Sequence, residues 1–303
     1  MTPSSEPLPP HPPRAERRQM GPRVVSPLKR RFHSLARTGR ALLLRLASPI
    51  DRLALILNGK SELPPIHLRR HSGPLNAFER AAAEYVGILS ALVGFGRSSR
   101  VLDVGSGAGA LAVMLKERLG PEGRYLGLDV DRACIRWCLA HLRDDRFDFR
   151  HHNYWNATYH PQGVRFRAWP VEAGGEDIVV LKSVFTHMLT ADVEFYIGEL
   201  KRVLSTGGSG VVTAFTYESV DSSVERLFSH DGGGFRFARA GSPESAIAYP
   251  RDWLLGEFAK HGLAVEFHPG FWRPGIGRTL TYQDVIVARH LNSSTLEEKR
   301  ARP

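Results

Sequence analysis

Apolar and polar residues follow two different periods along most of this chain. Short apolar runs bounded by turn residues predict strands at 100–104, 124–129, 147–151, 177–181, 210–215, 264–269 and 282–289. Segments with apolar positions at helical spacing separate most of these runs and predict helices at 110–119, 131–142, 191–204 and 251–261. Strands that alternate with helices indicate an α/β fold, in which helices cover both faces of a mostly parallel sheet.

Two features near the C-terminus depart from this alternation. Residues 216–250, with three glycines at 232–234, separate one strand from the next helix. A connection of this length is typical of a lid or a substrate-binding insertion. The last two strands follow a helix, so we expect them to pair as an antiparallel hairpin at the sheet edge.

The N-terminal region has a different pattern. Residues 1–25 carry seven prolines and no apolar periodicity, which predicts a disordered tail. Ser26-Pro27 is typical of a helix start, Ser48-Pro49 predicts a second short helix that ends near Asn58-Gly59, and Asn76 predicts the cap of a helix over 76–92. The first helix has an apolar face surrounded by arginines: Leu28, Phe32, Leu35, Leu42 and Leu46, with Arg30, Arg37, Arg40 and Arg45.

This basic segment, residues 26–60, allows two interpretations. It can be an amphipathic helix that lies on an anionic membrane or on a partner, or an arm that packs on the body with its arginines in solvent. Arg45, Asp51 and Arg52 interrupt the apolar run, so we do not expect it to span a bilayer. The segment also lacks the pattern of a signal peptide.

Charge and cysteine content narrow the function classes. Residues 1–72 contain 14 Lys or Arg and 4 Asp or Glu, whereas the other 231 residues contain 27 of each. The neutral body argues against a grip on nucleic acid phosphates. The two cysteines, Cys134 and Cys138, lie four apart in a predicted helix, where we interpret them as small core residues. We therefore expect a reducing, cytoplasmic location, with peripheral membrane contact if the basic arm provides it.

The segment VLDVGSGAGA, residues 101–110, carries the strongest chemical signal. Gly105, Gly107 and Ala110 satisfy a dinucleotide-binding pattern, which alone leaves an NAD(P)-dependent oxidoreductase open. Asp103 ends the strand before these glycines, where its carboxylate would repel a pyrophosphate and suit a cationic amine. Asp129 ends the next strand, where an acid accepts hydrogen bonds from ribose hydroxyls. Both acids favour a cationic nucleoside as the cofactor.

With these residues the chain resembles the class I S-adenosylmethionine-dependent methyltransferases over roughly residues 97–290. VLDVGSGAGA and GLDVD are similar to the first two motifs of the superfamily, and 177–188 and 199–208 to later segments. HHNYWNATYHPQG, SVFTHM, GFWRPG and TYQDVIVA resemble a bacterial branch that modifies small molecules and saccharides. The resemblance implies a Rossmann-like, doubly wound, seven-stranded sheet with the C-terminal hairpin, preceded by an N-terminal helical extension.

The resemblance also assigns candidate cofactor residues. Gly105 and Gly107 would let the backbone approach the methionine part, Asp103 would orient its amine, and Asp129 would bind the ribose. Asn153 replaces the acid that usually accepts from the adenine amine, and its side-chain oxygen can still accept that bond. Neighbouring positions complete the candidate cofactor site: Ser106, Gly109, Val130, Tyr154, Lys182 and Ser183.

His187 is the candidate catalytic residue. It follows the fourth strand, at the sheet edge where open α/β folds bind ligands, and an imidazole can take the proton of an alcohol near neutral pH. The alternative is a histidine that only bonds a neighbouring loop. Candidate substrate contacts, each with a structural alternative, are Tyr249, Trp272, Gln283 and Asp284. The cluster of His151, His152 and His160 lacks metal-ligand spacing, so no metal site is predicted.

These residues lead to one expected function and two rivals. The segment LKSVFTH lacks the motif of base amino methylation, and neither cysteine lies where cytosine methylation needs a nucleophile. We expect an S-adenosylmethionine-dependent methyltransferase that methylates a hydroxyl of a saccharide or specialised metabolite. The rivals are an NAD(P)-dependent oxidoreductase and a non-catalytic binding protein of the same fold. The expected division of the chain is a tail at 1–25, a basic helical arm at 26–72, a methyltransferase domain at 73–290 with the insertion 216–250, and a tail at 291–303.

Overall fold

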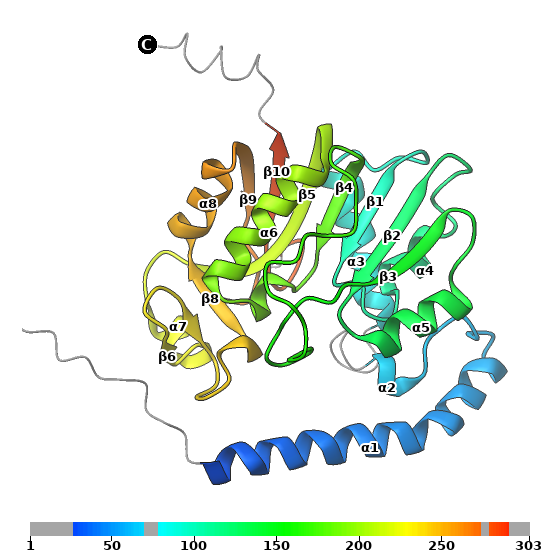
Figure 1. Cartoon of the computed structure of the whole chain (residues 1–303), viewed down its shortest axis with the longest axis horizontal. Coiled ribbons are helices and arrows are strands. Elements are labelled where there is room, and N and C mark those ends of the chain that lie inside the picture. The colour runs from blue at the N-terminus through cyan, green and yellow to red at the C-terminus, as the bar shows by residue number, and fades with distance from the viewer. Residues whose placement is uncertain (1–26, 70–77, 274–278, 291–303) are drawn as a thin grey trace, which may run out of the picture.

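The computed structural model describes residues 27–69, 78–273 and 279–290 (Figure 1). Both predicted tails, the Ser26 and Asn76 caps and residues 274–275 of the GFWRPG segment lie outside these ranges. The central part of the described sheet consists of β1 (Arg100–Val104), β2 (Arg124–Asp129), β3 (Phe147–His151), β4 (Glu176–Leu181), β5 (Leu204–Tyr217), β9 (Leu263–His268) and β10 (Asp284–His290). Their order is β3-β2-β1-β4-β5-β10-β9.

The pairing directions agree with the sequence prediction. β1 to β5 are mutually parallel, whereas β10 pairs antiparallel with both β5 and β9. The predicted C-terminal hairpin is therefore confirmed, with β9 at the edge. β5 is longer than expected, because the chain passes from the preceding helix into the strand at Leu204 without a loop. The described chain has the Rossmann-like α/β fold expected from its sequence.

Alternate strand positions point into two hydrophobic cores, one on each face of the sheet. The helices that supply them are α3 (Phe78–Leu92), α4 (Ala110–Leu115), α5 (Arg132–His141), α6 (Thr190–Val203) and α8 (Arg251–Lys260). Leu102 and Val179 pack with α6 and α8, whereas their neighbours Val101 and Ile178 pack with α3, α4 and α5. The period of two along each strand thus explains why the buried strands read as continuous apolar runs. Cys134 and Cys138 are buried and form no disulfide, as predicted for core residues.

The region 216–250 adds structure that the sequence did not predict. It contains α7 (Ser222–Leu227), β6 (His230–Asp231), β7 (Arg236–Phe237), the 3-10 turn η2 (Pro243–Ser245) and β8 (Ile247–Pro250). β8 pairs in parallel with the last residues of β5, and β7 pairs antiparallel with β8. This small sheet extends β5 beyond the carboxyl edge of the central sheet.

The N-terminal arm is one long helix, α1 (Pro27–Leu57), followed by the short α2 (Ile66–Arg69). The prediction of a second helix that starts at Ser48-Pro49 is wrong, because α1 continues through Pro49. Tertiary bonds hold the turns beside the proline: Asp51 accepts from the Ile66 N–H at 2.8 Å, and Arg52 donates to the carbonyls of Ser61 and Leu63. These contacts offset the cost of a proline inside a helix.

The same arm is joined to the body by apolar contacts. Leu55 of α1, with Leu63 and Leu68, packs in one cluster with Ala108 of the glycine-rich turn and Cys134 of α5. Lys60 and Glu79 add an exposed ion pair of 2.8 Å. The C-terminal part of α1 is therefore fixed close to the turn that follows β1.

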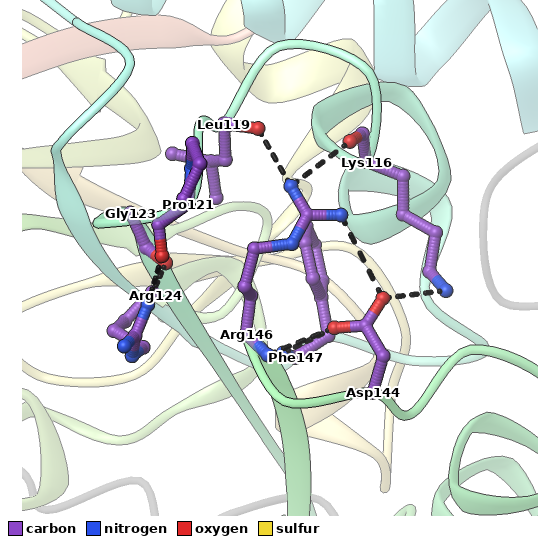
Figure 2. Close-up of polar contacts among 8 residues, drawn as sticks. All are labelled: Lys116, Leu119, Pro121, Gly123, Arg124, Asp144, Arg146 and Phe147. Atoms are coloured by element: carbon purple, nitrogen blue, oxygen red, sulfur yellow. Dashed lines mark hydrogen bonds and ion pairs between the residues drawn. The ribbon is translucent and has the colours of Figure 1, made fainter.

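At the amino ends of β2 and β3, polar side chains tie the loops together (Figure 2). Asp144 accepts from the backbone N–H groups of Arg146 and Phe147 and pairs with Lys116 at 3.2 Å. Arg146 in turn donates to the Leu119 carbonyl at 2.6 Å. We call Lys116, Leu119, Asp144, Arg146 and Phe147 the amino-edge cluster, and each of its polar bonds closes a loop of the fold.

Candidate functional site

A cavity of about 450 Å³ opens at the carboxyl edge of the sheet. Its walls come from the turn after β1, the ends of β2 and β4, the segment after β3, the region 216–250 and Gln283, the residue before β10. Of the predicted cofactor residues, those that line it are Asp103, Gly105, Ser106, Gly107, Asp129, Val130, Tyr154, Lys182 and Ser183. The fold thus brings together residues from across 80 positions of the chain at a place where ligands bind in open α/β folds.

The glycine-rich turn has backbone conformations that favour glycine. Gly105, Gly107 and Gly109 have φ of 81°, 54° and 78°, in the left-handed region. A Cβ at Gly109 would lie 2.5 Å from Leu142, so this residue allows α4 to pack on α5. A Cβ at Gly107 would meet nothing within 4 Å, because the backbone there borders the cavity. Gly109 is therefore a packing glycine, and Gly107 leaves room for a ligand.

Asp129 holds the turn from the end of β2. Its Oδ2 accepts from the Gly107 N–H at 2.7 Å, and its Oδ1 accepts from the Asp131 N–H at 2.7 Å. Each carboxylate oxygen keeps a further lone pair for a ligand hydroxyl. Burial raises the pKa of Asp129 to about 6, although these backbone bonds oppose the effect. At pH 7 the carboxylate is ionised, at a desolvation cost that a bound donor would reduce.

Asp103 supplies a second buried acid. The Tyr125 hydroxyl donates to it at 2.6 Å, and burial raises its pKa to about 6 against the opposing effects of Tyr125 and the Lys182 charge. Lys182 lies with its Nζ 4.2 Å from the Tyr85 ring, and burial lowers its pKa to about 8. The floor of the cavity therefore carries two carboxylates and one cation, which is a net negative environment.

His187 lies in the 3-10 turn η1 (Phe185–His187) directly after β4 and lines the same cavity. Its Nδ1 is 2.9 Å from the Glu244 carbonyl oxygen, which can only accept, so Nδ1 carries the hydrogen. In the neutral ring Nε2 is then the acceptor, and it lies 3.4 Å from the Tyr159 hydroxyl. Burial lowers the pKa of His187 below 6.5. The ring is therefore neutral at pH 7 and can accept a proton at Nε2.

Two buried polar atoms on the cavity wall have no hydrogen-bond partner within the described chain. They are the Ser106 hydroxyl and Nε2 of His152. Burial lowers the pKa of His152 to about 4, so its ring is neutral. Buried polar atoms are normally satisfied, and here a ligand with polar groups would satisfy both. His152 was not predicted as a cofactor residue, although it lies in the segment HHNYWNATYHPQG and on the cavity wall.

Ser183 and Gln283 form the wall beyond the end of β4. Ser183 has a φ of 55°, an uncommon conformation for a residue other than glycine, and its N–H donates to the Thr213 hydroxyl at 2.8 Å. Gln283 Oε1 accepts from the hydroxyls of Ser183 and Thr213 at 3.0 and 2.6 Å. Because Oε1 accepts both of these bonds, the side-chain nitrogen of Gln283 can offer a donor to the cavity. Of the predicted substrate residues, Gln283 is the one that the structure places on the cavity wall.

Three predicted substrate contacts are corrected by the structure. Tyr249 is fully buried and donates to the Phe185 carbonyl at 2.6 Å, so it supports η1 from the core. Asp284 is fully buried and accepts from the backbone N–H groups of Thr216 and Gly270 and from the Trp272 indole. Trp272 packs in the cluster under the region 216–250. All three are away from the cavity wall and stabilise the loops around it.

Asn153 also lies outside the main cavity. It borders a shallower pocket that shares Val130, Asp131 and Tyr159 with the cavity, and its Oδ1 is 2.7 Å from His160 Nε2. The Asn153 oxygen that was expected to accept from an adenine amine is therefore already bonded to His160. We correct the expectation: Asn153 is a wall residue of the adjoining pocket, and His160 fixes its orientation. The spacing of His160 from Asn153 did not predict this bond.

Further wall residues were not predicted as site residues, and metal ligands do not gather there. Asn156, Tyr159, Thr186, Phe215 and Ala246 line the cavity. Asn156 and Tyr159 belong to the segment HHNYWNATYHPQG after β3, and its resemblance to the methyltransferase family was the sequence feature that could have identified them. Within the described ranges, no group of three or more His, Cys, Asp or Glu side chains is placed to hold a metal ion.

Comparison with known proteins gives one domain match. Residues 101–208 match the family model described as a methyltransferase domain. Among solved structures, the chain is similar to a SAM-dependent methyltransferase from Methanosarcina mazei, at 16% identity over 65% of this chain and 94% of that one, with a TM-score of 0.48. It is also similar to the geranyl diphosphate C-methyltransferase of Streptomyces coelicolor, at 15% identity over 71% and 84%, with a TM-score of 0.48. A third similar chain comes from the complex between the Haloferax volcanii Trm112 methyltransferase activator and a putative methyltransferase. The identity is 16% over 71% of this chain and 98% of that one, with a TM-score of 0.48.

The domain match covers the turn after β1, the end of β2 and η1. It supports the methyltransferase domain that the sequence predicts, with S-adenosylmethionine as the expected cofactor. The cavity residues fit that cofactor: two carboxylates suit a cation and ribose hydroxyls, Gly107 leaves open space, and the Ser106 hydroxyl lacks a partner. At these identities and TM-scores, the similar structures say nothing about the ligands or substrates of this chain.

Proposed function

We propose that this methyltransferase domain transfers the methyl group to a hydroxyl of a saccharide or specialised metabolite, as in the bacterial branch that modifies small molecules. One observation carries the proposal: Nε2 of a neutral His187 borders the cavity that also holds Asp103 and Asp129. A base of this kind is needed for an alcohol, whose proton must be removed as its oxygen reacts.

The buried acids of the cavity would hold the cofactor. Asp103 would bind the amine of the methionine part, Asp129 the ribose hydroxyls, and Ser106 a further polar group of the same molecule. Gly105 and Gly107 would let the backbone come close. When bound, S-adenosylmethionine supplies a methyl group on a positively charged sulfur, which is a good leaving group. The negative floor of the cavity favours this cation electrostatically.

His187 would act on the acceptor. The Glu244 carbonyl fixes its tautomer, so that Nε2 accepts the hydroxyl proton while the acceptor oxygen bonds to the methyl carbon. The bond between that carbon and sulfur breaks, and its electron pair stays on sulfur. The Tyr159 hydroxyl, 3.4 Å from Nε2, marks the position that an acceptor hydroxyl would take or share. Alignment of the three reacting atoms then accounts for much of the rate.

The region 216–250 would complete the acceptor site. It supplies Ala246 to the cavity wall and the Glu244 carbonyl to His187, and Phe215 adds an apolar ring at its start. Polar groups at Asn156 and Gln283 and apolar groups at Met188 and Phe215 line the same space. A mixed wall of this kind suits a hydroxylated metabolite better than a wholly apolar substrate. This supports the interpretation of 216–250 as a substrate insertion.

An acceptor search tests the proposal. The protein is incubated with S-adenosylmethionine labelled in the methyl group and with fractionated cell extract, and the labelled product is analysed by mass and NMR spectroscopy. We expect the label on an ether oxygen, and far less label with His187→Gln. Label on nitrogen or carbon would contradict the oxygen acceptor. Oxidation or reduction of a compound with NAD(P), without methyl transfer, would contradict the enzyme class.

A further inference from the structure

A band of large apolar side chains runs along the outer face of α1, which lies along one side of the body (Figure 1). We call it the outer band, and it consists of Leu42, Leu43, Leu46, Ile50, Leu53, Ile56 and Leu57. Each of these side chains is more than half exposed, and Ile50 and Leu57 are 77% exposed. Monomeric proteins rarely expose a continuous apolar patch of this kind unless it binds something.

The outer band cannot be covered by the body to which the helix is attached. With about 3.6 residues per turn, Leu46, Ile50, Leu53 and Leu57 share one side of the helix, and Ser48 and Leu55 lie on the opposite side. Ser48 and Leu55 are the buried positions, in contact with α2 and with the cluster behind the glycine-rich turn. The arm therefore already packs on the body through its inner face. Packing on the body explains that face, and no residue of the described ranges covers the outer band.

The charge of the helix indicates what the occupant is. α1 contains seven Lys or Arg and a single acidic residue, Asp51. Asp51 is engaged on the inner side, where it pairs with Arg69 and accepts from the Ile66 N–H. Arg45 is exposed next to the outer band. A leucine-rich band on a helix with seven basic residues and one acidic residue is complementary to a surface that is apolar beneath and anionic above.

A second copy of the chain fits this helix less well. Two helices that associate through leucine bands stabilise the seam with oppositely charged flanking pairs. Two copies of α1 would bring arginines together instead, with no acidic residue available on that side. The sequence N-terminal to the outer band continues the pattern, since Leu28, Phe32 and Leu35 fall at the same helical phase and further arginines surround them.

We propose that α1 lies in the interface of an anionic lipid bilayer, with the outer band at the level of the acyl chains and the arginines at the phosphates. No helix within the described residues is long and apolar enough to cross a membrane, so the helix would lie in the plane of the surface. β10 ends on the side of the molecule away from α1, and the parallel strands run opposite to β10 (Figure 1). The carboxyl edge, with its cavity, thus faces the side on which the membrane lies.

Sedimentation with lipid vesicles tests this proposal on the full chain. Vesicles of phosphatidylcholine alone are compared with vesicles that also contain phosphatidylglycerol. We expect binding to the anionic vesicles that is about tenfold or more stronger than to the neutral ones and that weakens with salt. Leu46→Gln with Ile50→Gln removes two exposed side chains of the outer band and should weaken that binding by about tenfold or more. Arg45→Gln should weaken it by a smaller factor.

A matched control separates the outer band from general surface apolarity. Val220→Gln with Leu280→Gln alters two exposed apolar residues on the body and should leave vesicle binding at the wild-type level. Unchanged binding by the Leu46/Ile50 variant would overturn the proposal. So would a wild-type dimer, seen by light scattering, that fails to bind vesicles and dissociates in that variant, because the occupant would then be a second copy. The same variant should bind S-adenosylmethionine in solution like the wild type, so this test is independent of the proposed methyl transfer.

Discussion

The two edges of the central sheet carry acidic residues in opposite electrostatic situations. At the carboxyl edge, burial raises the pKa of Asp129 to about 6, and its oxygens face a cavity. At the amino edge, burial alone would raise the pKa of Asp144. The backbone N–H of Arg146 and the Lys116 ammonium together outweigh burial, so the pKa of Asp144 lies below its ordinary value (Figure 2). The Asp144 carboxylate is bonded to two backbone N–H groups and to Lys116, all within the fold. The Asp129 carboxylate keeps lone pairs that can accept hydrogen bonds from a ligand. The contrast separates a functional edge from a structural one.

Two polar atoms on the cavity wall show the same contrast. Within the described residues, the Ser106 hydroxyl and His152 Nε2 at the carboxyl edge are buried without a hydrogen-bond partner, as are several polar atoms elsewhere in the fold. In the amino-edge cluster, Arg146 donates to a carbonyl and Asp144 accepts from two N–H groups. A site that must bind a ligand is built with polar groups that the free protein does not satisfy. Substitutions at the two edges should therefore differ in kind, with losses of activity at one and losses of stability at the other.

The largest effect is expected for His187→Gln. Loss of the base should lower kcat by about 10²–10⁴-fold, while S-adenosylmethionine affinity stays within about twofold. Methyl transfer from labelled cofactor and calorimetry measure the two quantities. His141→Gln, an exposed histidine of α5 outside the cavity, is the control and should keep full activity. Wild-type kcat in His187→Gln would remove this residue from the chemistry.

Asp129→Ala should have the next largest effect. It removes the acceptor for ribose hydroxyls and leaves the Gly107 N–H unpaired, so cofactor affinity should fall by about 30- to 100-fold, or about 2–3 kcal/mol. Titration calorimetry measures this change. Asp144→Ala, at the other end of the sheet, should bind the cofactor like the wild type. Equal losses in the two variants would show that the edges do not differ in function.

Cofactor binding should depend on pH through the same two acids. The raised pKa values of Asp103 and Asp129, about 6 each, mean that both become neutral as the pH falls below 6 and lose their attraction for a cation. Affinity should therefore weaken as the pH falls below 6, by up to about tenfold per pH unit for each acid that loses its charge. Fluorescence titration across this range measures the profile. A profile that is flat down to pH 5 would contradict the role of these carboxylates.

The smallest effect is expected in the amino-edge cluster. Arg146→Ala should lower the free energy of unfolding by about 1 kcal/mol, without a change in cofactor affinity. Because the folded pKa of Asp144 is lowered, its stabilising contribution is present above its ordinary pKa and is lost as the pH falls through the folded value. The stability difference between wild type and Asp144→Asn, from urea unfolding, should thus be nearly constant from pH 7 to about pH 5 and shrink as the pH falls below the ordinary pKa of 3.8. A difference that grows on acidification would contradict this sign.

Much of the fold and the cofactor site could be predicted from local sequence. The strand ends at Asp103 and Asp129 and the glycines at 105 and 107 lie in continuous motifs, and the period of two fixes which side of a strand is buried. The interruption at 216–250 was visible, but its small sheet depends on pairing with β5, which local pattern does not encode. Pro49 was misinterpreted for a similar reason, since the bonds that keep α1 intact come from residues 61–69.

The candidate substrate residues show the limit more clearly. Asp284 accepts bonds from Thr216, Gly270 and Trp272, and Tyr249 donates to a carbonyl in η1. Each polar tip is satisfied by a partner from another part of the fold, so its position in a motif could not show whether it faced a cavity or the core. Gln283, one residue before Asp284, points the other way and reaches the cavity. Neighbouring residues of a strand point to opposite faces, and the sequence alone left the register open.

The most direct test of the account is a competition for the cavity, measured by native mass spectrometry. The protein is mixed with equal concentrations of S-adenosylmethionine and NAD at pH 7.5, and the mass of the complex identifies the ligand. We expect one S-adenosylmethionine per chain in the wild type and a much smaller bound fraction in Asp129→Ala. A complex with NAD, or equal S-adenosylmethionine binding by wild type and Asp129→Ala, would contradict it.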